Sequence, residues 1–279
     1  MLTLRVDHVT IAGADLSALE RAFVAQGLDA AYGGVHSNGI THMSVLGFDD
    51  GSYVELISTV DKGKRAPLWH DSISRDAGIC AWAVEADDVS AEASRLSAKG
   101  IPVSGPVHMS RQRPDGKTAE WDLAFVGAHE PGAKFPFIIR DRTPRELRVA
   151  PSESVAGTEL TGISKVMLGV TDMSAAIDSF RRAYDLSEPG ITRDEDFGAR
   201  LANFKGAPVI LAAPLKKGGW LAERLGRFGE LPCGFLIRTA DFAKTIQRFK
   251  AAIQSELFGR RVAWLSAESF PGTRIGFRS

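Results

Sequence analysis

Apolar residues along this chain first alternate as in a β-strand and then recur every three to four residues as in an α-helix. This strand-then-helix pattern occurs four times. In the first copy, residues 7–27, Val9 and Ile11 alternate as in a β-strand, and Leu16 and Phe23 then recur at the spacing of an amphipathic helix. Three later copies cover residues 79–100, 163–186 and 233–253. A fixed order of elements repeated at similar intervals indicates a duplicated structural unit.

An aspartate precedes each predicted helix and is placed to cap it, and short strand patterns follow. The four aspartates are Asp15, Asp88, Asp172 and Asp241. Turn residues such as Gly33–Gly34 and Asp49–Gly51 separate the strands that follow the first helix. Each unit is therefore predicted to be β-α-β-β-β. The alternative is an unrelated α+β protein with capped helices, which the same order in all four intervals disfavours.

The fold class that follows is α+β, with four βαβββ units in two domains. Residues 149–157 are small and polar and are interpreted as a linker between pairs of units. The predicted domains are residues 1–147, which carry the candidate site, and residues 160–279.

Composition removes several classes of function. The 34 Lys and Arg residues balance 34 Asp and Glu residues, so the chain has no general attraction to nucleic acid or to anionic membranes. Cys80 and Cys233 lie far apart and lack metal or disulfide spacing, which fits a reducing compartment. No apolar run is long enough to span a bilayer. We expect a cytoplasmic protein without nucleic-acid or membrane partners.

Several short motifs give the first half a family resemblance. They are Asp7-His8, Gly33-Gly34-Val-His36, Tyr53-Val-Glu55-Leu-Ile57, Arg111-Gln-Arg113-Pro-Asp-Gly116, Trp121-Asp-Leu123 and Pro136-Phe-Ile. In this order, over residues 7–145, they resemble glyoxalase-like domain proteins of the vicinal oxygen chelate superfamily. Beyond residue 160 the resemblance rests only on the repeated pattern. The resemblance implies paired units that form two glyoxalase-like domains, with sheets curled around a cleft and any metal on the concave face.

His8 and Glu55 are the central candidates for metal binding. Alternation along the first strand predicts that Leu4, Val6, His8 and Thr10 share one face, and Glu55 lies in the last strand of the same unit. An imidazole and a carboxylate on neighbouring strands suit Zn, Fe(II), Mn, Ni or Co. The alternative is a buried histidine with ordinary hydrogen bonds and a Glu55 paired with an arginine, in which case the protein has no metal cofactor.

The other units lack the corresponding ligands. The position of His8 is occupied by Ala81, Lys165 and Gly234 in the later units, and Phe137 stands at the position of Glu55 in the second. A complete four-ligand site of the glyoxalase I type is therefore absent. A metal would need His36 or His42 as a third ligand, with His36 the expected one, or it would bind weakly through two protein groups and waters.

All six histidines lie within the first 129 residues, so any histidine chemistry belongs to the first domain. His36, in a glycine-rich loop, is also a candidate general acid or base, or else an exposed turn residue. His42 is a weaker candidate for substrate contact.

Three more residues are candidates for substrate binding. Arg111 and Arg113 alternate before a Pro-Asp-Gly turn, and their guanidinium groups are suited to gripping an anionic substrate, unless the hairpin only adds solubility. Trp121 forms either a cavity wall or part of the core.

The predicted function is therefore a divalent-metal-dependent, glyoxalase-like enzyme: a lyase, an isomerase or a dioxygenase. His8, His36 and Glu55 would hold the metal, Glu55 and His36 would act in catalysis, and the substrate would be small, oxygenated and anionic. The alternative is a metal-independent protein of the same fold that binds or sequesters a small molecule. The histidine-free second domain leaves open a packing role or a homodimer.

Overall fold

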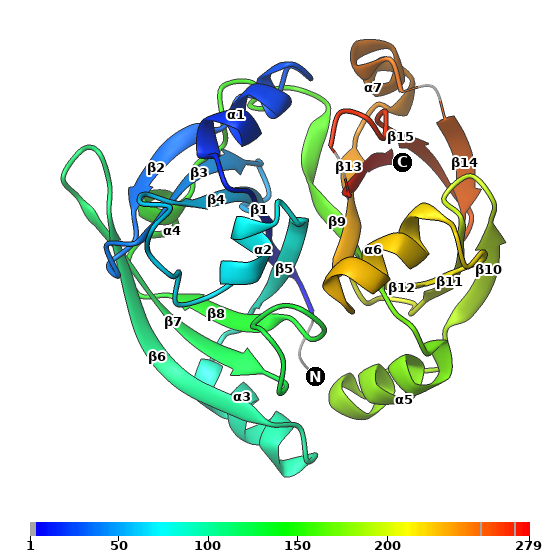
Figure 1. Cartoon of the computed structure of the whole chain (residues 1–279), viewed down its shortest axis with the longest axis horizontal. Coiled ribbons are helices and arrows are strands. Elements are labelled where there is room, and N and C mark those ends of the chain that lie inside the picture. The colour runs from blue at the N-terminus through cyan, green and yellow to red at the C-terminus, as the bar shows by residue number, and fades with distance from the viewer. Residues whose placement is uncertain (1–3, 252, 271) are drawn as a thin grey trace.

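The computed structural model describes residues 4–251, 253–270 and 272–279 and contains two curled eight-stranded sheets, which lie side by side in Figure 1. The first sheet contains β1 (Val6–Ala12), β2 (Ala31–Val35), β3 (Thr41–Gly47), β4 (Tyr53–Thr59), β5 (Gly78–Glu85), β6 (Val103–Gln112), β7 (Thr118–Val126) and β8 (Phe137–Asp141). The second contains β9 (Leu160–Gly169), β10 (Gly190–Asp194), β11 (Ala199–Asn203), β12 (Val209–Pro214), β13 (Pro232–Thr239), β14 (Ile253–Leu257), β15 (Arg260–Trp264) and β16 (Arg274–Arg278).

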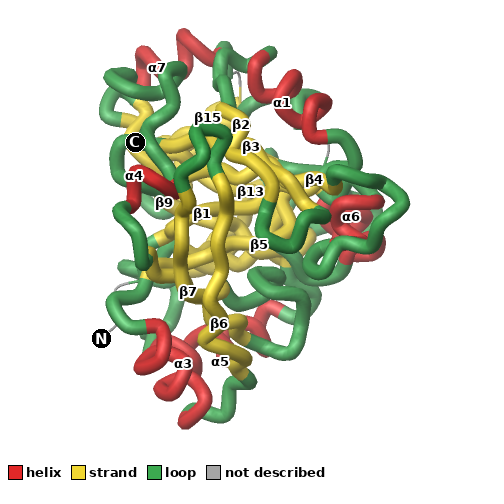
Figure 2. The backbone as a smooth tube through the Cα atoms, turned by 90° about the vertical axis from the view of Figure 1, so that its left-hand side faces the viewer, coloured by secondary structure: helices red, strands yellow, loops and turns green. Residues whose placement is uncertain are grey.

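One helix per unit follows the first strand of that unit, and three further helices lie between units. The unit helices are α1 (Leu16–Val24), α3 (Val89–Ala98), α5 (Met173–Tyr184) and α7 (Phe242–Phe249). The others are α2 (His70–Ser74), α4 (Arg145–Arg148) and α6 (Trp220–Phe228). The helices lie around the outside of the strands (Figure 2). None of the described helices is long and apolar enough to cross a membrane.

The strand order confirms the α+β fold of four βαβββ units. The first sheet runs β2-β3-β4-β1-β5-β8-β7-β6, and the second repeats the same order as β10-β11-β12-β9-β13-β16-β15-β14. In each sheet the first strands of its two units, β1 with β5 and β9 with β13, pair antiparallel at the centre. Each sheet is thus two copies of one unit joined back to back, with a concave face shared between them.

All four predicted caps form. The side chains of Asp15, Asp88, Asp172 and Asp241 each accept a hydrogen bond from the backbone N–H three residues later. These bonds satisfy donors that have no partner within the helix. Local sequence therefore determines where each unit helix begins.

The predicted face of the first strand is wrong because β1 contains a bulge. The pairing of β1 with β5 shifts between Val6 and His8, so Asp7 is an extra residue in the ladder. Leu4 and Val6 consequently pack in the core beneath the helices, with Val9 and Ile11. His8 lies on the concave face instead. Because of the bulge, His8 and the apolar residues Leu4 and Val6 lie on opposite faces of the sheet.

The segment 149–157 is packed rather than loose. Val149 and Val155 are buried, and Ser152 exchanges hydrogen bonds with the backbone of Gly47 at the end of β3. One apolar cluster also contains residues from both halves of the chain. Within it, the ring of Phe23 in α1 packs against that of Phe270, with centroids 4.8 Å apart. The predicted linker is therefore held between two sheets that share a core.

Candidate functional site

The concave face of the first sheet encloses a cavity of about 60 Å³, which exceeds the roughly 10–15 Å³ that one water molecule requires. Its polar end is formed by His8, His36, Asn38, Thr41, Tyr53 and Glu55. Its apolar walls are Ile57, Pro67, Leu68, Trp69, Met109, Trp121, Leu123, Phe137 and Ile139. Sites for small organic molecules are mostly apolar with a few placed polar groups, and this cavity has that character.

His8 is held in the cavity by the aspartate that precedes it. Its Nδ1 lies 2.5 Å from Oδ1 of Asp7, and its ring stacks on Tyr53 with centroids 4.5 Å apart. Nδ1–H donates to the carboxylate, so Nε2 is left with its lone pair. Nε2 lies 3.9 Å from Oε2 of Glu55. The bulge at Asp7 allows adjacent residues of one strand to make this contact.

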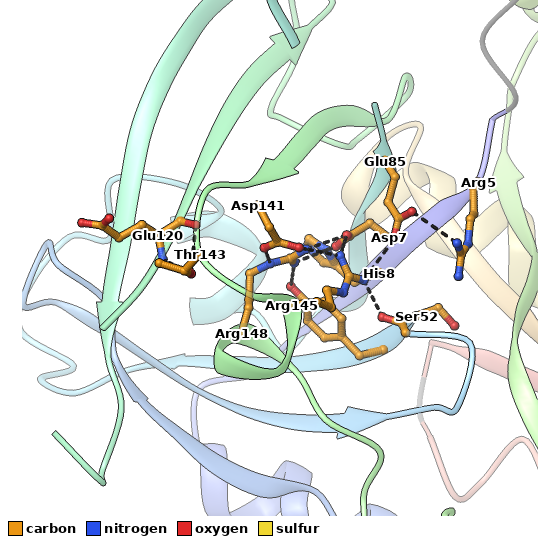
Figure 3. Close-up of polar contacts among 12 residues, drawn as sticks. Arg5, Asp7, His8, Ser52, Glu85, Glu120, Asp141, Thr143, Arg145 and Arg148 are labelled. Atoms are coloured by element: carbon orange, nitrogen blue, oxygen red, sulfur yellow. Dashed lines mark hydrogen bonds and ion pairs between the residues drawn. The ribbon is translucent and has the colours of Figure 1, made fainter. Parts of the chain in front are cut away.

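Asp7 in turn accepts hydrogen bonds from two arginines of α4, the helix that follows β8 in the chain (Figure 3). Arg148 donates to both carboxylate oxygens at 2.8 and 2.7 Å, and Arg145 donates to Oδ2 at 2.5 Å. Burial alone would raise the pKa of the Asp7 carboxyl, but Arg148 and His8 hold that pKa well below its usual range. Asp7 therefore stays ionised and keeps Nδ1 of His8 protonated.

Arg148 is itself buried and anchored on several sides. It donates to Asp141 at the end of β8 and to the hydroxyl of Tyr53, the latter at 2.9 Å. Neighbouring carboxylates raise the pKa of Arg148 well above its usual value despite its burial. The result is a fully paired buried network that fixes both the position and the tautomer of His8.

Glu55 lies opposite the two histidines. Its Oε2 accepts a hydrogen bond from the hydroxyl of Thr10 at 2.9 Å, and its Oε1 lies 3.5 Å from Nε2 of His36. Burial alone would raise the pKa of Glu55, but the hydrogen bond from His36, the nearby imidazole of His8 and the hydroxyl of Thr10 lower that pKa to about 2. The carboxylate is therefore ionised at neutral pH.

His36 is positioned by the turn that follows β2. Its Nδ1 lies 2.9 Å from Oγ1 of Thr41, and its backbone N–H donates to the carbonyl of the same threonine. Asn38 closes the turn by accepting hydrogen bonds from the backbone N–H groups of Ile40 and Thr41. The imidazole thus presents Nε2 to Glu55 from a braced loop.

The half of the cavity contributed by the second unit is apolar. In the first unit Thr10 pairs with Glu55, and in the second the equivalent Ala83 pairs with Phe137, so Phe137 occupies the position of Glu55. The ring of Phe137 packs against His8 at 5.2 Å. All the charged groups therefore come from one side of the cavity.

In the second sheet, other residues occupy the positions that correspond to His8, Thr10 and Glu55. Lys165 stands where His8 does, and Met167 pairs with Ile210 where Thr10 pairs with Glu55. The Lys165 ammonium donates to Oδ1 of Asn203 at 2.7 Å, and burial lowers its pKa to about 8. Apolar side chains including Phe197 and Trp264 pack on this face. The polar site is confined to the first sheet.

A short segment before α2 covers the cavity. Trp69 adopts a left-handed backbone conformation with φ of 56°, which is uncommon for a bulky residue. Its backbone N–H donates to Glu130 at 3.0 Å, and its indole N–H donates to the carbonyl of Pro131 at 2.8 Å. These bonds hold the wall formed by residues 67–69 over the concave face.

Four of the seven residues predicted for the site come together in the cavity: His8, His36, Glu55 and Trp121. Trp121 is both wall and core, because it lines the cavity and is 7% exposed. His42 does not line it. Alternation along β3 turns its ring towards Tyr32, with centroids 6.1 Å apart, and burial lowers its pKa.

The two arginines also lie away from the cavity. Arg111 lies two residues after Met109 in β6, so both side chains point to the same face of the sheet, but Arg111 is beyond the edge of the cavity. There its guanidinium donates to Sδ of Met43 and to the carbonyl of Arg148. Arg113 donates to Asp115 and to the carbonyl of Leu147. Both guanidinium groups thus have partners outside the cavity, and neither lines the space beside His8 and Glu55.

Sequence reasoning missed the supporting residues Thr10, Thr41, Arg145 and Arg148. Thr10 was detectable, because it lies two residues after His8 on the same strand. The arginines were not, since nothing in the pattern links Arg148 to an aspartate 141 positions earlier.

The side chains of His8, His36 and Glu55 are of the types that bind divalent metals. Two imidazole Nε2 atoms and an ionised carboxylate meet here, and a protein carboxylate supports one of the imidazoles from behind, as is usual for metal-binding histidines. Ligands about 2.1 Å from one ion lie roughly 3.0–3.4 Å apart, so the separations of 3.5 and 3.9 Å are slightly too wide. Within residues 4–251, 253–270 and 272–279, no group of three or more His, Cys, Asp or Glu side chains is arranged to hold a metal.

Comparisons with known proteins agree with this architecture. None of the curated proteins matches the sequence. The crystal structure of a hypothetical protein from Staphylococcus aureus is similar over 98% of both chains, with 16% identity and a TM-score of 0.64. That likeness concerns the fold. A methylmalonyl-CoA epimerase from Mycobacterium tuberculosis is similar over 44% of this chain and 91% of its own, with 19% identity and a TM-score of 0.40.

The family comparison is more informative. The model of the glyoxalase-like domain family matches residues 6–184, from β1 to the end of α5. This match covers more than half of the chain and includes every charged residue of the cavity. The resemblance predicted from the repeats and motifs is confirmed, and the chain belongs to the glyoxalase-like domain family of the vicinal oxygen chelate superfamily.

Proposed function

We propose that this protein is a divalent-metal-dependent enzyme that acts on a small oxygenated molecule in the cavity of the first sheet. The observation that carries the proposal is the meeting of His8, His36 and Glu55 at one end of an otherwise apolar cavity. Zn, Fe(II), Mn, Ni and Co all accept such nitrogen and oxygen ligands. The reaction belongs to the lyase, isomerase or dioxygenase classes found in the superfamily.

His8 and Glu55 are the proposed principal ligands. Asp7 keeps the Nδ1 of His8 protonated, so the Nε2 lone pair is available, and the low pKa of Glu55 keeps its carboxylate charged. Small side-chain rotations would bring the two groups to ligand spacing. When bound, the ion supplies Lewis acidity towards adjacent oxygens of the substrate.

His36 has two proposed roles that experiment can separate. It stands at the cavity with Nε2 directed to Glu55, so it either completes the ligand set or moves a proton to or from the substrate. A His36→Gln variant that loses metal identifies a ligand. A variant that keeps metal and loses turnover identifies an acid or base.

The apolar walls orient the rest of the substrate and exclude water from the reacting end. Trp121 and Phe137 present flat apolar surfaces beside the polar end. The expectation that the substrate is anionic depended on Arg111 and Arg113. Since these arginines do not line the cavity, we propose an oxygenated substrate that does not need to be anionic.

Titration with Co(II) tests this proposal directly, because its absorption spectrum reports coordination by nitrogen and oxygen. The expected result is saturation near one equivalent in the wild type and in His42→Ala, whose histidine lies outside the cavity. The Glu55→Gln variant should lose the signal. A spectrum identical in wild type and Glu55→Gln would overturn the metal role.

A second candidate is a metal-independent binding protein. It is favoured by the partners that Glu55 already has in Thr10 and His36, and by Ala81 and Phe137 at the ligand positions of the second unit. In that case the polar pair would bind an oxygenated ligand by hydrogen bonds alone. Such a protein would bind its ligand equally well after treatment with a chelator.

A further inference from the structure

A second hollow lies in the other half of the molecule, between α6 and the beginning of β16. Its volume is about 340 Å³, and its walls include Trp220, Arg224, Arg227, Phe228 and Arg274. None of these residues lines the cavity that contains His8. The hollow is within the size range of small-molecule sites.

Positive charge gathers around this hollow and is only partly compensated. Three arginines line it against one carboxylate, that of Glu223. Arg75 adds a fourth guanidinium, which donates to the backbone carbonyl of Arg227 at 2.7 Å, while the guanidinium of Arg227 donates to the backbone carbonyl of Arg75 at 3.0 Å. Within the part of the chain that the structure describes, none of the four arginines has a carboxylate oxygen within 4.0 Å. Arg148, by contrast, is paired with two aspartates.

Arg224 is the most deeply buried of the group, at 5% exposure. Its guanidinium donates to the carbonyls of Ala77, Ile79 and Pro232, which are neutral, and its Nε has no hydrogen-bond partner among the described residues. Leaving a buried charge unpaired is costly, and carbonyl acceptors offset only part of that cost. Burial accordingly lowers the pKa of Arg224 and that of Arg274.

Aromatic rings hold the guanidiniums in place. Arg75, Arg224 and Arg227 surround the ring of Phe228 at 5.0, 5.4 and 4.8 Å from its centroid. Arg274 lies 4.6 Å from the centroid of Trp220. Cation–π contacts bring like charges together and fix their planes. One nitrogen of Arg227 donates to the carbonyl of Arg75, but among the described residues no hydrogen bond occupies its other N–H groups or those of Arg274, so these can bind a ligand.

We propose that this hollow binds a phosphate group, carried by a small phosphorylated molecule or as the free ion. Arginine forks match the oxygens of phosphate, and a dianion would neutralise the net charge of the three lining arginines and Glu223. The hollow is larger than a bare phosphate needs, which favours a phosphate ester. This site is separate from the metal site and does not depend on it.

Isothermal titration calorimetry on the full chain tests the proposal, with inorganic phosphate and glycerol phosphate as probes at constant ionic strength. Saturable binding near one equivalent is expected, with the ester binding more tightly than the free ion. Arg227→Met and Arg274→Met should each weaken binding by about tenfold or more, since each removes a hydrogen bond to a charged group. Arg224 is left intact because it ties three backbone carbonyls together.

Arg193→Met is the matched control, because it removes the same charge from an exposed arginine on β10. Unchanged binding in this variant, with weakened binding in the other two, supports the site. Equal weakening in all three variants would mean only general charge attraction and would overturn it. So would the absence of saturable heat with either probe in the wild type. Tighter binding of inorganic phosphate than of the ester would keep the site and assign it to the free ion.

Discussion

Replacing Asp7 by Asn is the most informative single change, because it removes one charge from the centre of the buried network while keeping its shape. Asp7 is 0% exposed and accepts hydrogen bonds from His8, Arg145 and Arg148. An amide can accept at one atom only, and its NH₂ group would face cationic donors. The substitution therefore leaves Arg148 with one carboxylate partner, Asp141, instead of two.

Breaking a buried ion pair by removing one partner costs about 3–5 kcal/mol. Because Arg148 retains Asp141, we expect the lower end, about 3 kcal/mol of unfolding free energy. Urea unfolding at pH 7 measures this loss. A second effect is expected at the site, since removing an outer partner of a metal-binding histidine typically weakens metal binding by about 10–100-fold.

The control is Asp122→Asn. Asp122 also accepts a hydrogen bond from an arginine, Arg142, at 2.8 Å, but that pair lies at the surface, where ion pairs contribute little. If Asp7→Asn is as stable as Asp122→Asn and binds metal as tightly as the wild type, the buried network does not support His8 in the way described here.

Three further predictions concern other parts of the chain. Glu55→Gln should abolish metal binding and turnover while its circular dichroism spectrum stays that of the wild type; retained turnover would contradict the role of this carboxylate. Lys165 has a pKa of about 8 in the folded chain and near 10.5 when unfolded, so the unfolded chain binds more protons between these values. The unfolding free energy of the wild type relative to Lys165→Met should therefore rise from pH 8 to 10.5, by at most about 3 kcal/mol, and a flat difference in denaturant melts would refute the shift. Gly47→Ala would place a Cβ 2.1 Å from the carbonyl oxygen of Ala150, so it should lose roughly 1–3 kcal/mol in the same melts, whereas Gly218→Ala, which meets no atom within 4 Å, should not.

The repeated architecture could be predicted from sequence because its signals are local. Each capping aspartate acts on a backbone N–H three residues away, and the apolar periods that follow depend on neighbours in the same element. His8 and Ala81 each lie seven residues before the capping aspartate of their unit, Asp15 or Asp88, which predicts that they occupy equivalent positions. The structure places them on β1 and β5, the two strands that pair at the centre of the sheet. The match of Glu55 with Phe137 holds for the same reason.

What sequence could not supply was geometry that depends on distant parts of the chain. The bulge at Asp7 breaks the alternation of β1 and reverses the expected face of Val6. The orientation of Arg111 depends on where the cavity ends along β6, and its partner carbonyl comes from α4. Periodicity gives the face of a strand but not the extent of a cavity along it.

The central claim is that His8 and Glu55 hold a metal ion, and its most direct test is elemental analysis by mass spectrometry. Untagged wild-type protein, His8→Ala, Glu55→Ala and the control His42→Ala would be compared after anaerobic reconstitution with Fe(II), Zn, Mn, Ni and Co. About one metal per chain is expected in the wild type and in His42→Ala, with loss of that metal in the other two variants. Metal at background level in all four proteins would contradict the claim and favour a cavity that binds its ligand without a metal.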